Sequence, residues 1–253
     1  MKKKMFDIGN WKFEIRNLKA LPGLKFQVLS FRLGTHSFIP LIFLFLLFFP
    51  FDLFAHTLPY DLNKLSKTGI GWIYLKLGYT HILPQGYDHV LFVLGIFFLN
   101  PNLKSVLWQA TAFTIAHSIT LGLAMYGMIK PPGSVIEAII ALSIVFVAAE
   151  NIFTTELKWW RIVIVFCFGL VHGCGFASAL TQLGLPQNDY LLSLVAFNMG
   201  VELGQVTVIL LAFFIVGKWF SQRIWYRQRI VIPTSLAIGM IALYWTIERT
   251  LSI

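Results

Sequence analysis

Long apolar segments, separated by short polar turns, make up most of this sequence after residue 84. A helix of about 20 apolar residues matches the thickness of the hydrocarbon core of a bilayer. A soluble domain is about 45–50% apolar and about 25% charged, whereas this chain is 57% hydrophobic and 12% charged. We therefore predict an all-α integral membrane protein that is built as a bundle of six transmembrane helices. The predicted spans are 84–100, 104–128, 134–154, 159–183, 190–216 and 230–250.

The region before these spans divides into a basic head and a hydrophobic segment. Together they occupy residues 1–55, and residues 56–253 form the polytopic membrane domain. The apolar core of the hydrophobic segment has about 15 residues, which suits a signal peptide better than a full span. Cleavage after Ala55 and retention as a membrane anchor both stay open. The next stretch, Gly69–Leu83, predicts a short interfacial helix with Trp72 and Tyr74 at the membrane surface.

Lysine and arginine are unevenly distributed about the predicted spans. With the basic N-terminus in the cytoplasm, only five of the 20 Lys and Arg residues fall outside, namely Lys64, Lys67, Lys76, Lys130 and Arg249. Cytoplasmic loops carry such an excess of basic residues. We therefore predict a multi-pass protein of the bacterial inner membrane with the mature termini outside. Topology and contacts with lipid headgroups account for the net charge of +9, so no nucleic-acid partner is expected.

Polar and ionisable side chains recur inside the predicted spans, where they are costly and usually functional. Asp88 and His89 lie near the outer end of the first span, and His117 and His172 lie near the centres of two other spans. The candidate metal ligands are His81, His89, His117, His172, Asp88 and Glu202. The supporting polar candidates are Ser118, Asn198, Gln205, Glu137, Glu150 and Asn151.

Imidazoles and carboxylates that converge in a water-excluded bundle indicate a site for a divalent transition metal such as nickel, cobalt or zinc. We predict that three histidines meet and that two carboxylates act as ligands or orient a histidine: His89, His117, His172, Asp88 and Glu202. His81 is a further candidate, although Pro84 separates its direction from the helix of His89. The alternative is that these groups only form hydrogen bonds between helices.

The stretch from Trp72 to Trp219 resembles the HupE/UreJ family of bacterial membrane proteins, which is named for hydrogenase and urease accessory roles. The matching blocks are "GYDHVLFVLG" (86–95), "FTIAHSITLGLA" (113–124), "IEAIIALSIVFVAAEN" (136–151), "FGLVHGCGFA" (168–177) and "FNMGVELGQ" (197–205). The "FAH" at 54–56 is similar to the family's N-terminal signal followed by histidine. The resemblance implies a secondary transporter of nickel or cobalt that supplies metalloenzyme assembly, with maturation partners that the sequence does not identify.

Three functions stay open on the residues alone. The first is a permease for Ni²⁺ or Co²⁺, which the sequence favours. The second is an intramembrane zinc hydrolase that acts on a lipid or a periplasmic substrate, with Glu202 and Asp88 as its catalytic carboxylates. The third is an accessory scaffold whose polar network only fixes the fold. A permease needs a polar path across the membrane, whereas a hydrolase needs a pocket closed toward the cytoplasm.

Overall fold

The computed structural model describes the backbone of residues 4–8, 11–19, 25–30, 66–130, 132–182 and 189–252. Side chains are described for residues 66–130, 132–177 and 189–252. The hydrophobic segment before residue 56, with its predicted cleavage point at Ala55, lies outside the described residues. The predicted signal peptide or anchor therefore stays a prediction.

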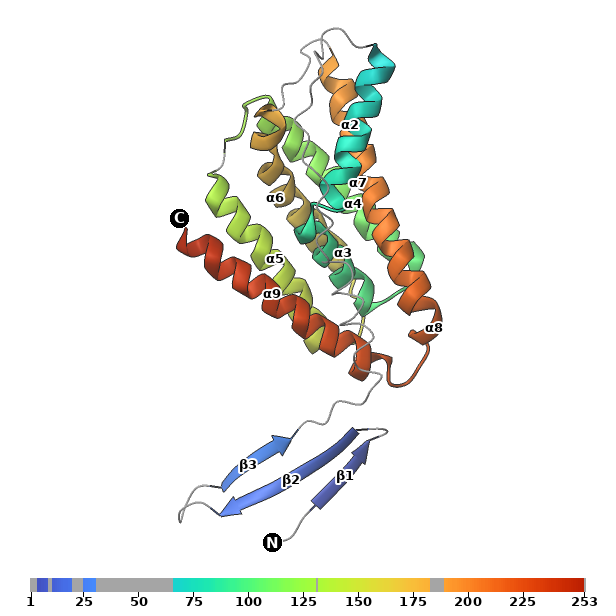
Figure 1. Cartoon of the computed structure of the whole chain (residues 1–253), viewed down its shortest axis with the longest axis vertical. Helices are drawn as coiled ribbons and strands as arrows, with labels where there is room; N and C mark the ends of the chain where they lie inside the picture. Colours follow the sequence, from blue (N-terminus) through green and yellow to red (C-terminus); the bar gives the residue numbers. More distant parts are fainter. Residues whose placement is uncertain are drawn as a thin grey trace.

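Three strands form an antiparallel sheet near the N-terminus, in the order β1-β2-β3 (Figure 1). The strands are β1 (Lys4–Ile8), β2 (Trp11–Lys19) and β3 (Lys25–Ser30). The sequence predicts an all-α protein, and the described residues from 66 onward confirm this, whereas the described residues 4–30 form strands. The missed signal is the alternation of apolar and polar residues that opens β2, "WKFEIR", because a period of two is typical of a strand.

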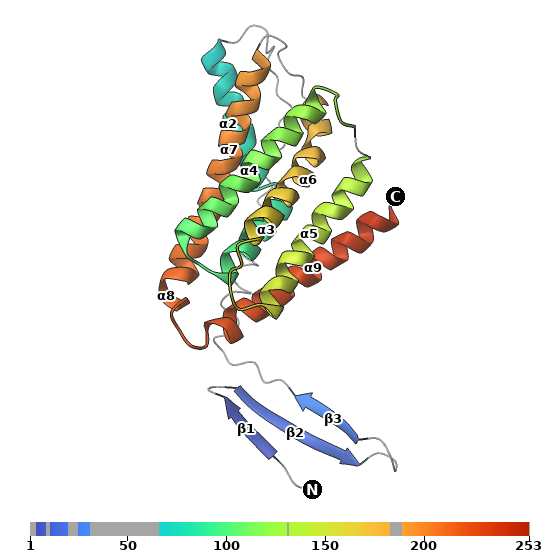
Figure 2. The same cartoon turned by 180° about the vertical axis from the view of Figure 1, so that it is seen from behind.

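The described part of the membrane domain is made of helices (Figures 1 and 2). In chain order these are α2 (Lys67–Ile82), α3 (Tyr87–Leu99), α4 (Leu103–Met125), α5 (Gly133–Phe153), α6 (Arg161–Gln182), α7 (Tyr190–Ala212), α8 (Lys218–Phe220) and α9 (Ile232–Leu251). Two π-helical turns lie between these helices: η4 (Phe213–Gly217) connects α7 to α8, and η5 (Arg227–Val231) leads into α9.

Four described helices are long and apolar enough to cross a membrane: Leu103–Met125, Gly133–Phe153, Tyr190–Phe220 and Arg227–Leu251. The bent pair α2 and α3 makes a fifth candidate span, and the described part of α6, Arg161–Ala177, is a shorter apolar helix. The protein is therefore a multi-pass helical membrane protein. The count of six spans, the sidedness of the termini and the inner membrane as location stay predictions.

Helices α2 and α3 correct the predicted start of the membrane domain. The two helices are bent by 67° at a short break, and only together are they long and apolar enough to cross a membrane. Alone, α3 with its 13 residues is about 20 Å long, which is less than the ~30 Å hydrocarbon core. Tyr74, which we predict at the membrane surface, is 1% exposed, whereas Trp72 is 68% exposed. A new helix does begin just after Pro84, at Tyr87, as the sequence predicts.

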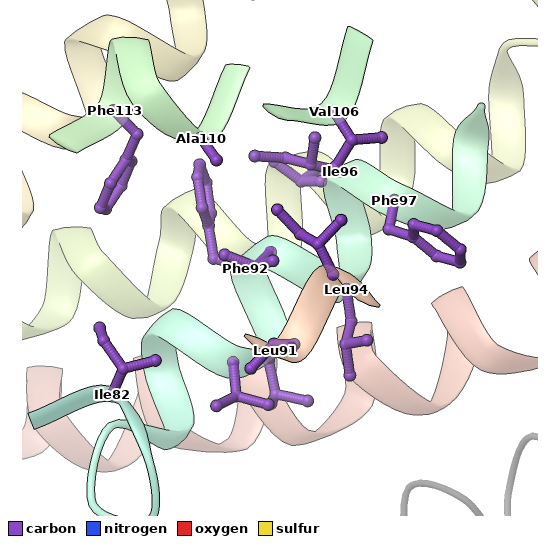
Figure 3. Close-up of a cluster of buried hydrophobic side chains, with 14 of the residues drawn as sticks. Ile82, Leu91, Phe92, Leu94, Ile96, Phe97, Val106, Ala110 and Phe113 are labelled. Atoms are coloured by element: carbon purple, nitrogen blue, oxygen red, sulfur yellow. The ribbon is translucent and has the colours of Figure 1, made fainter. Parts of the chain in front are cut away.

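Helix α3 lies at the centre of the bundle. Every residue from His89 to Phe98 is buried, and Figure 3 shows Leu91, Phe92 and Leu94 packed among side chains of the surrounding helices. A helix that is apolar on all sides must be covered on all sides. The surrounding helices supply this cover, so the break before α3 lies inside protein rather than in lipid.

Glycines bring two pairs of helices into close contact, α2 with α7 and α4 with α6. Gly78 of α2 packs on the backbone of Phe197 in α7, and Gly200 of α7 packs on the backbone of Leu75 in α2. In the same way Gly173 of α6 packs on the carbonyl of His117 in α4. Small residues at such contacts let two backbones approach, which favours helix association in a membrane. Figures 1 and 2 both show α2 beside α7 and α4 beside α6.

A buried ion pair joins α5 and α6 at the bundle end that also holds the α3–α4 turn, which we call the inner end. Arg161 Nη1 lies 3.0 Å from Glu150 Oε2, and both side chains are at most 5% exposed. The amide of Asn151 donates to the carbonyl of Gly95 in α3 at 2.8 Å. Arg227 donates to the carbonyls of Asn151 and two neighbours at the end of α5. Glu150 and Asn151 thus hold helix ends together.

We expect Gly200→Ala to destabilise the protein by at least about 2 kcal/mol, because overpacking of a tight contact is costly. A Cβ at this position would lie 2.7 Å from the backbone nitrogen of Tyr79. Gly133→Ala is the matched control, since a Cβ there has no neighbour within 4 Å. Thermal unfolding of both variants in detergent measures the effect. Equal melting temperatures would show that α2 and α7 do not need this close contact.

Candidate metal centre

Three histidines from three helices meet at the break between α2 and α3. His81 is in the last turn of α2, His89 is in the first turn of α3, and His117 is in α4. One ring nitrogen from each lies within 4.8 Å of the others. The ring centroids of His81 and His89 are 4.8 Å apart, and that of His117 is 5.8 Å from His89. The bend at Pro84-Gln85-Gly86 therefore brings His81 opposite His89, although they lie on different helices.

One ring nitrogen of each histidine in this group is buried without a hydrogen-bond partner. Nε2 of His81, of His89 and of His117 has no partner among the residues that the structure describes. A buried polar atom without a partner loses its interactions with water and gains nothing in return. Three such atoms side by side indicate a site that is completed by a bound species. Neutral imidazole is a common ligand of transition-metal ions.

Asn198 of α7 fixes the orientation of His117. Its amide nitrogen donates to the carbonyl of Leu194 at 2.8 Å, so its Oδ1 is left as the acceptor for His117 Nδ1 at 3.2 Å. With the proton on Nδ1, the lone pair of His117 lies on Nε2, which is the unpartnered atom. This is the arrangement in which an outer amide orients a metal-binding imidazole. The sequence predicts Asn198 as a supporting polar residue.

His172 of α6 lies beside the group without belonging to it. Its ring centroid is 5.0 Å from that of His89, and its Nε2 lies 3.0 Å from Ser143 Oγ. The Ser143 hydroxyl donates to the carbonyl of Ile140, so it accepts from His172 and leaves the lone pair on Nδ1. That Nδ1 has no partner among the described side chains. The predicted ligand role of His172 thus stays a prediction, as a neighbour of the three-histidine group.

The carboxylates that we predicted as ligands or orienting groups lie outside this group. Asp88 accepts hydrogen bonds from two guanidinium nitrogens of Arg249 in α9, at 3.1 and 3.2 Å. Glu202 accepts from the hydroxyls of Thr111, at 2.7 Å, and Thr114. Both carboxylates are satisfied by partners that are distant in the sequence. Among the described residues, no charged side chain joins the three-histidine group.

The supporting polar candidates lie in different parts of the bundle. Asn198 contacts the histidine group, and Gln205 donates to Thr114 at 2.9 Å beside Glu202. Ser118 donates to its own helix, and Glu137 is exposed near the outer end. Glu150 and Asn151 lie at the inner end, away from the histidines.

Sequence reasoning missed Ser143 and Thr111. Thr111 was detectable, because it shares the helix face of Thr114 and His117.

A cavity of about 450 Å³ reaches the histidines from the opposite end of the bundle, which we call the outer end. Its lining includes His81, His89 and His172, and Gln85, Glu137 and Arg249 line it as well. On the inner side the histidines meet a layer of aromatic rings formed by Phe92, Phe113 and Phe168. Figure 3 shows Phe92 and Phe113 in the buried apolar cluster. The site is therefore open toward the outer end and covered toward the inner end.

We expect Asn198→Leu to weaken the binding of Ni²⁺ about 10- to 100-fold, because His117 loses the acceptor that fixes its lone pair. Thr207→Val on the same helix is the control, since its hydroxyl is exposed and donates only to Leu203. Calorimetric titration of both purified variants measures the affinity, and ¹⁵N chemical shifts of the histidines report the tautomer. An unchanged affinity of Asn198→Leu would remove Asn198 from the site.

The comparisons with known proteins agree with this architecture. A family model described as "HupE / UreJ protein" matches residues 62–249, which is well over half of the chain and includes every helix that carries the histidines. The corresponding searches of curated proteins and of solved structures returned no match. The match covers the broken span and each residue of the histidine group. The chain therefore belongs to the HupE/UreJ family.

Proposed function

We propose that the protein is a permease for a divalent transition-metal ion, with Ni²⁺ or Co²⁺ as the cargo. The observation that carries this proposal is the set of three buried imidazoles whose Nε2 atoms lack partners and whose ring nitrogens lie within 4.8 Å. Membership of the HupE/UreJ family supports metal transport in general. His81, His89 and His117 are the proposed ligands, and His172 is the adjacent fourth candidate.

The ligand chemistry favours a cargo site over a storage site. Three neutral imidazoles bind nickel and related ions, but they leave the two positive charges of the ion uncompensated. Asp88, which lines the same cavity as His81 and His89, is already paired with Arg249. Conduction and transport need binding that is favourable enough to load yet weak enough to unload. A site without a charged ligand meets this condition.

The fold around the site also favours transport. Transporter sites commonly lie where a helix is broken inside the membrane, and the break between α2 and α3 places His81 and His89 in this way. Polar groups continue inward from the histidines along α4 and α7, through Asn198, Thr114, Glu202 and Gln205. Together with the cavity at the outer end, they outline a path that is interrupted by the aromatic layer. We interpret the structure as the outward-open form of an alternating-access cycle.

A hydrolytic function has less support from the same residues. Three histidines could hold zinc with an open position, and the cavity is covered toward the inner end. A hydrolase also needs a general base beside the metal-bound water. The two carboxylates assigned to that role, Asp88 and Glu202, are held by Arg249 and by two threonines. Among the described residues no carboxylate joins the histidine group.

We expect His81→Ala, His89→Ala and His117→Ala each to lower the affinity for Ni²⁺ at least tenfold, because each removes a direct ligand, and even second-shell losses cost about 10–100-fold. His172→Ala should have a smaller effect than any of the three. Ser118→Ala is the control, since its hydroxyl bonds only to the adjacent turn of its own helix. Titration of purified protein with Ni²⁺, Co²⁺ and Zn²⁺ measures these affinities and ranks the ions.

Transport itself is measured as uptake of the same ions into proteoliposomes. The three histidine variants should lose uptake in the order in which they lose affinity. Tight binding without uptake in the unaltered protein would refute the permease. Unchanged affinity in His81→Ala and His117→Ala would refute the site and leave these histidines as contacts between helices.

A further inference from the structure

A second and larger cavity lies at the inner end of the bundle and plays no part in the proposed metal path. It measures about 720 Å³ and lies between the α3–α4 turn and the segment that connects α7 to α9. Its polar lining residues include Asn100, Asn102, Lys104, Lys218, Ser221 and Gln222. Two lysines line it, and none of its described lining residues is acidic. Such a cavity repels a divalent cation, so it needs another explanation.

The polar groups of this cavity are arranged as donors. The Oδ1 atom of Asn100 accepts from the backbone N–H of Asn102, and that of Asn102 accepts from the backbone N–H of Ser105. With both amide oxygens engaged, the NH₂ groups of these asparagines are left to donate. The ammonium groups of Lys104 and Lys218 have no acceptor function at all. Donors and positive charge together fit an anionic oxygen ligand such as a phosphate group.

The surroundings of the cavity indicate that this phosphate belongs to a lipid. Lys218 Nζ lies 5.5 Å from the ring of Trp219 and 5.9 Å from that of Phe214. Trp219 is 62% exposed and Phe214 is 56% exposed, which is typical of residues at and just below the membrane surface. Phe214 and Ile215 of η4 and Leu211 of α7 are exposed apolar residues, so an apolar surface continues from η4 onto α7. A ligand in the cavity can therefore have its charged group beside the lysines and its chains along α7.

The local backbone is also unusual at this place. The π-helical turn η4, Phe213–Gly217, lies between α7 and α8, and both of its end residues line the cavity. Single π-helical turns are rare and are frequent at functional sites. Gly217 is in close contact with the ring of Phe97 and with Pro101, so the turn is fixed against the end of α3 and the start of α4. The cavity is thus part of the folded bundle and not a gap between mobile loops.

We infer that this cavity binds the headgroup of an anionic phospholipid, with Lys104 and Lys218 paired to its phosphate. Basic pockets between membrane helices on the cytoplasmic side bind such headgroups, and the charge distribution predicts this end to be cytoplasmic. The site is independent of the metal centre, because it shares no residue with the histidine group or with the outer cavity. It would attach the α3–α4 turn and the α7–α9 connection to the inner leaflet.

The test is native mass spectrometry of the full chain in detergent, titrated with phosphatidylglycerol and, separately, with phosphatidylcholine. We expect preferential retention of phosphatidylglycerol. Each lysine contributes about fivefold to the affinity, so Lys104→Gln/Lys218→Gln should weaken retention about 25-fold. Lys158→Gln is the matched control, since Lys158 is an exposed lysine outside the cavity lining. Its retention of phosphatidylglycerol should stay within twofold of the unaltered protein.

Three outcomes would overturn the assignment. Equal retention by the double variant would show that the two lysines do not bind the headgroup. Equal retention of phosphatidylcholine would show that charge is not recognised. Displacement of the lipid by millimolar inorganic phosphate would assign the cavity to a soluble phosphate compound. The affinity of the double variant for Ni²⁺ should be unchanged, which separates this result from the fate of the permease proposal.

Discussion

The break between α2 and α3 is the constraint on which the rest of the structure depends. A helix end inside a bilayer leaves backbone groups without partners, and lipid cannot satisfy them. Here the turn satisfies part of the need itself, because the N–H groups of Leu83 and Gly86 donate to the carbonyls of Tyr79 and Ile82. The rest requires burial in protein, which explains why α3 is central and covered on all sides. The same geometry places the last turn of α2 against the first turn of α3, and so brings together two of the three histidines.

Much of this fold could be predicted from apolar lengths and turn residues, and the failures have specific causes. The spans at α4, α5, α7 and α9 agree with the predicted segments, whereas sequence spacing does not show that α2 and α3 are long enough to cross a membrane only as a bent pair. His81 was ranked below His172 for the same reason, since Pro84 hid its direction. The partners of Asp88 and Glu202 were out of reach: Arg249 lies 161 residues from Asp88, and Thr111 lies 91 residues from Glu202.

The polar side chains inside the bundle divide into those that are satisfied and those that are not. Glu150 and Arg161 form a buried pair, which is costly to desolvate and worse to break, and they hold helix ends at the inner side. Asp88 with Arg249 does the same at the outer side, where the pair lines the cavity. The histidine group differs, because the Nε2 atoms of His81, His89 and His117 are buried and have no partner among the described residues. Polar residues in a membrane are thus informative through their missing partners more than through their presence.

In the proposed permease the three histidines lie on three helices, so binding of the ion depends on how these helices are arranged. Glycine contacts join α2, which carries His81, to α7, and they join α4, which carries His117, to α6. Asn198 lies on α7 but orients the histidine of α4, so it bridges the two pairs. Any displacement of one pair past the other changes both the distances between ligands and the orientation of His117. An ion that binds one arrangement better than another shifts the equilibrium between them by that difference in affinity. The aromatic layer below the site has Phe92 on α3 and Phe113 on α4, the helices of His89 and His117, so a shift of α3 past α4 changes both the layer and the separation of these histidines. Parting this layer and loosening the ligands can therefore be one motion.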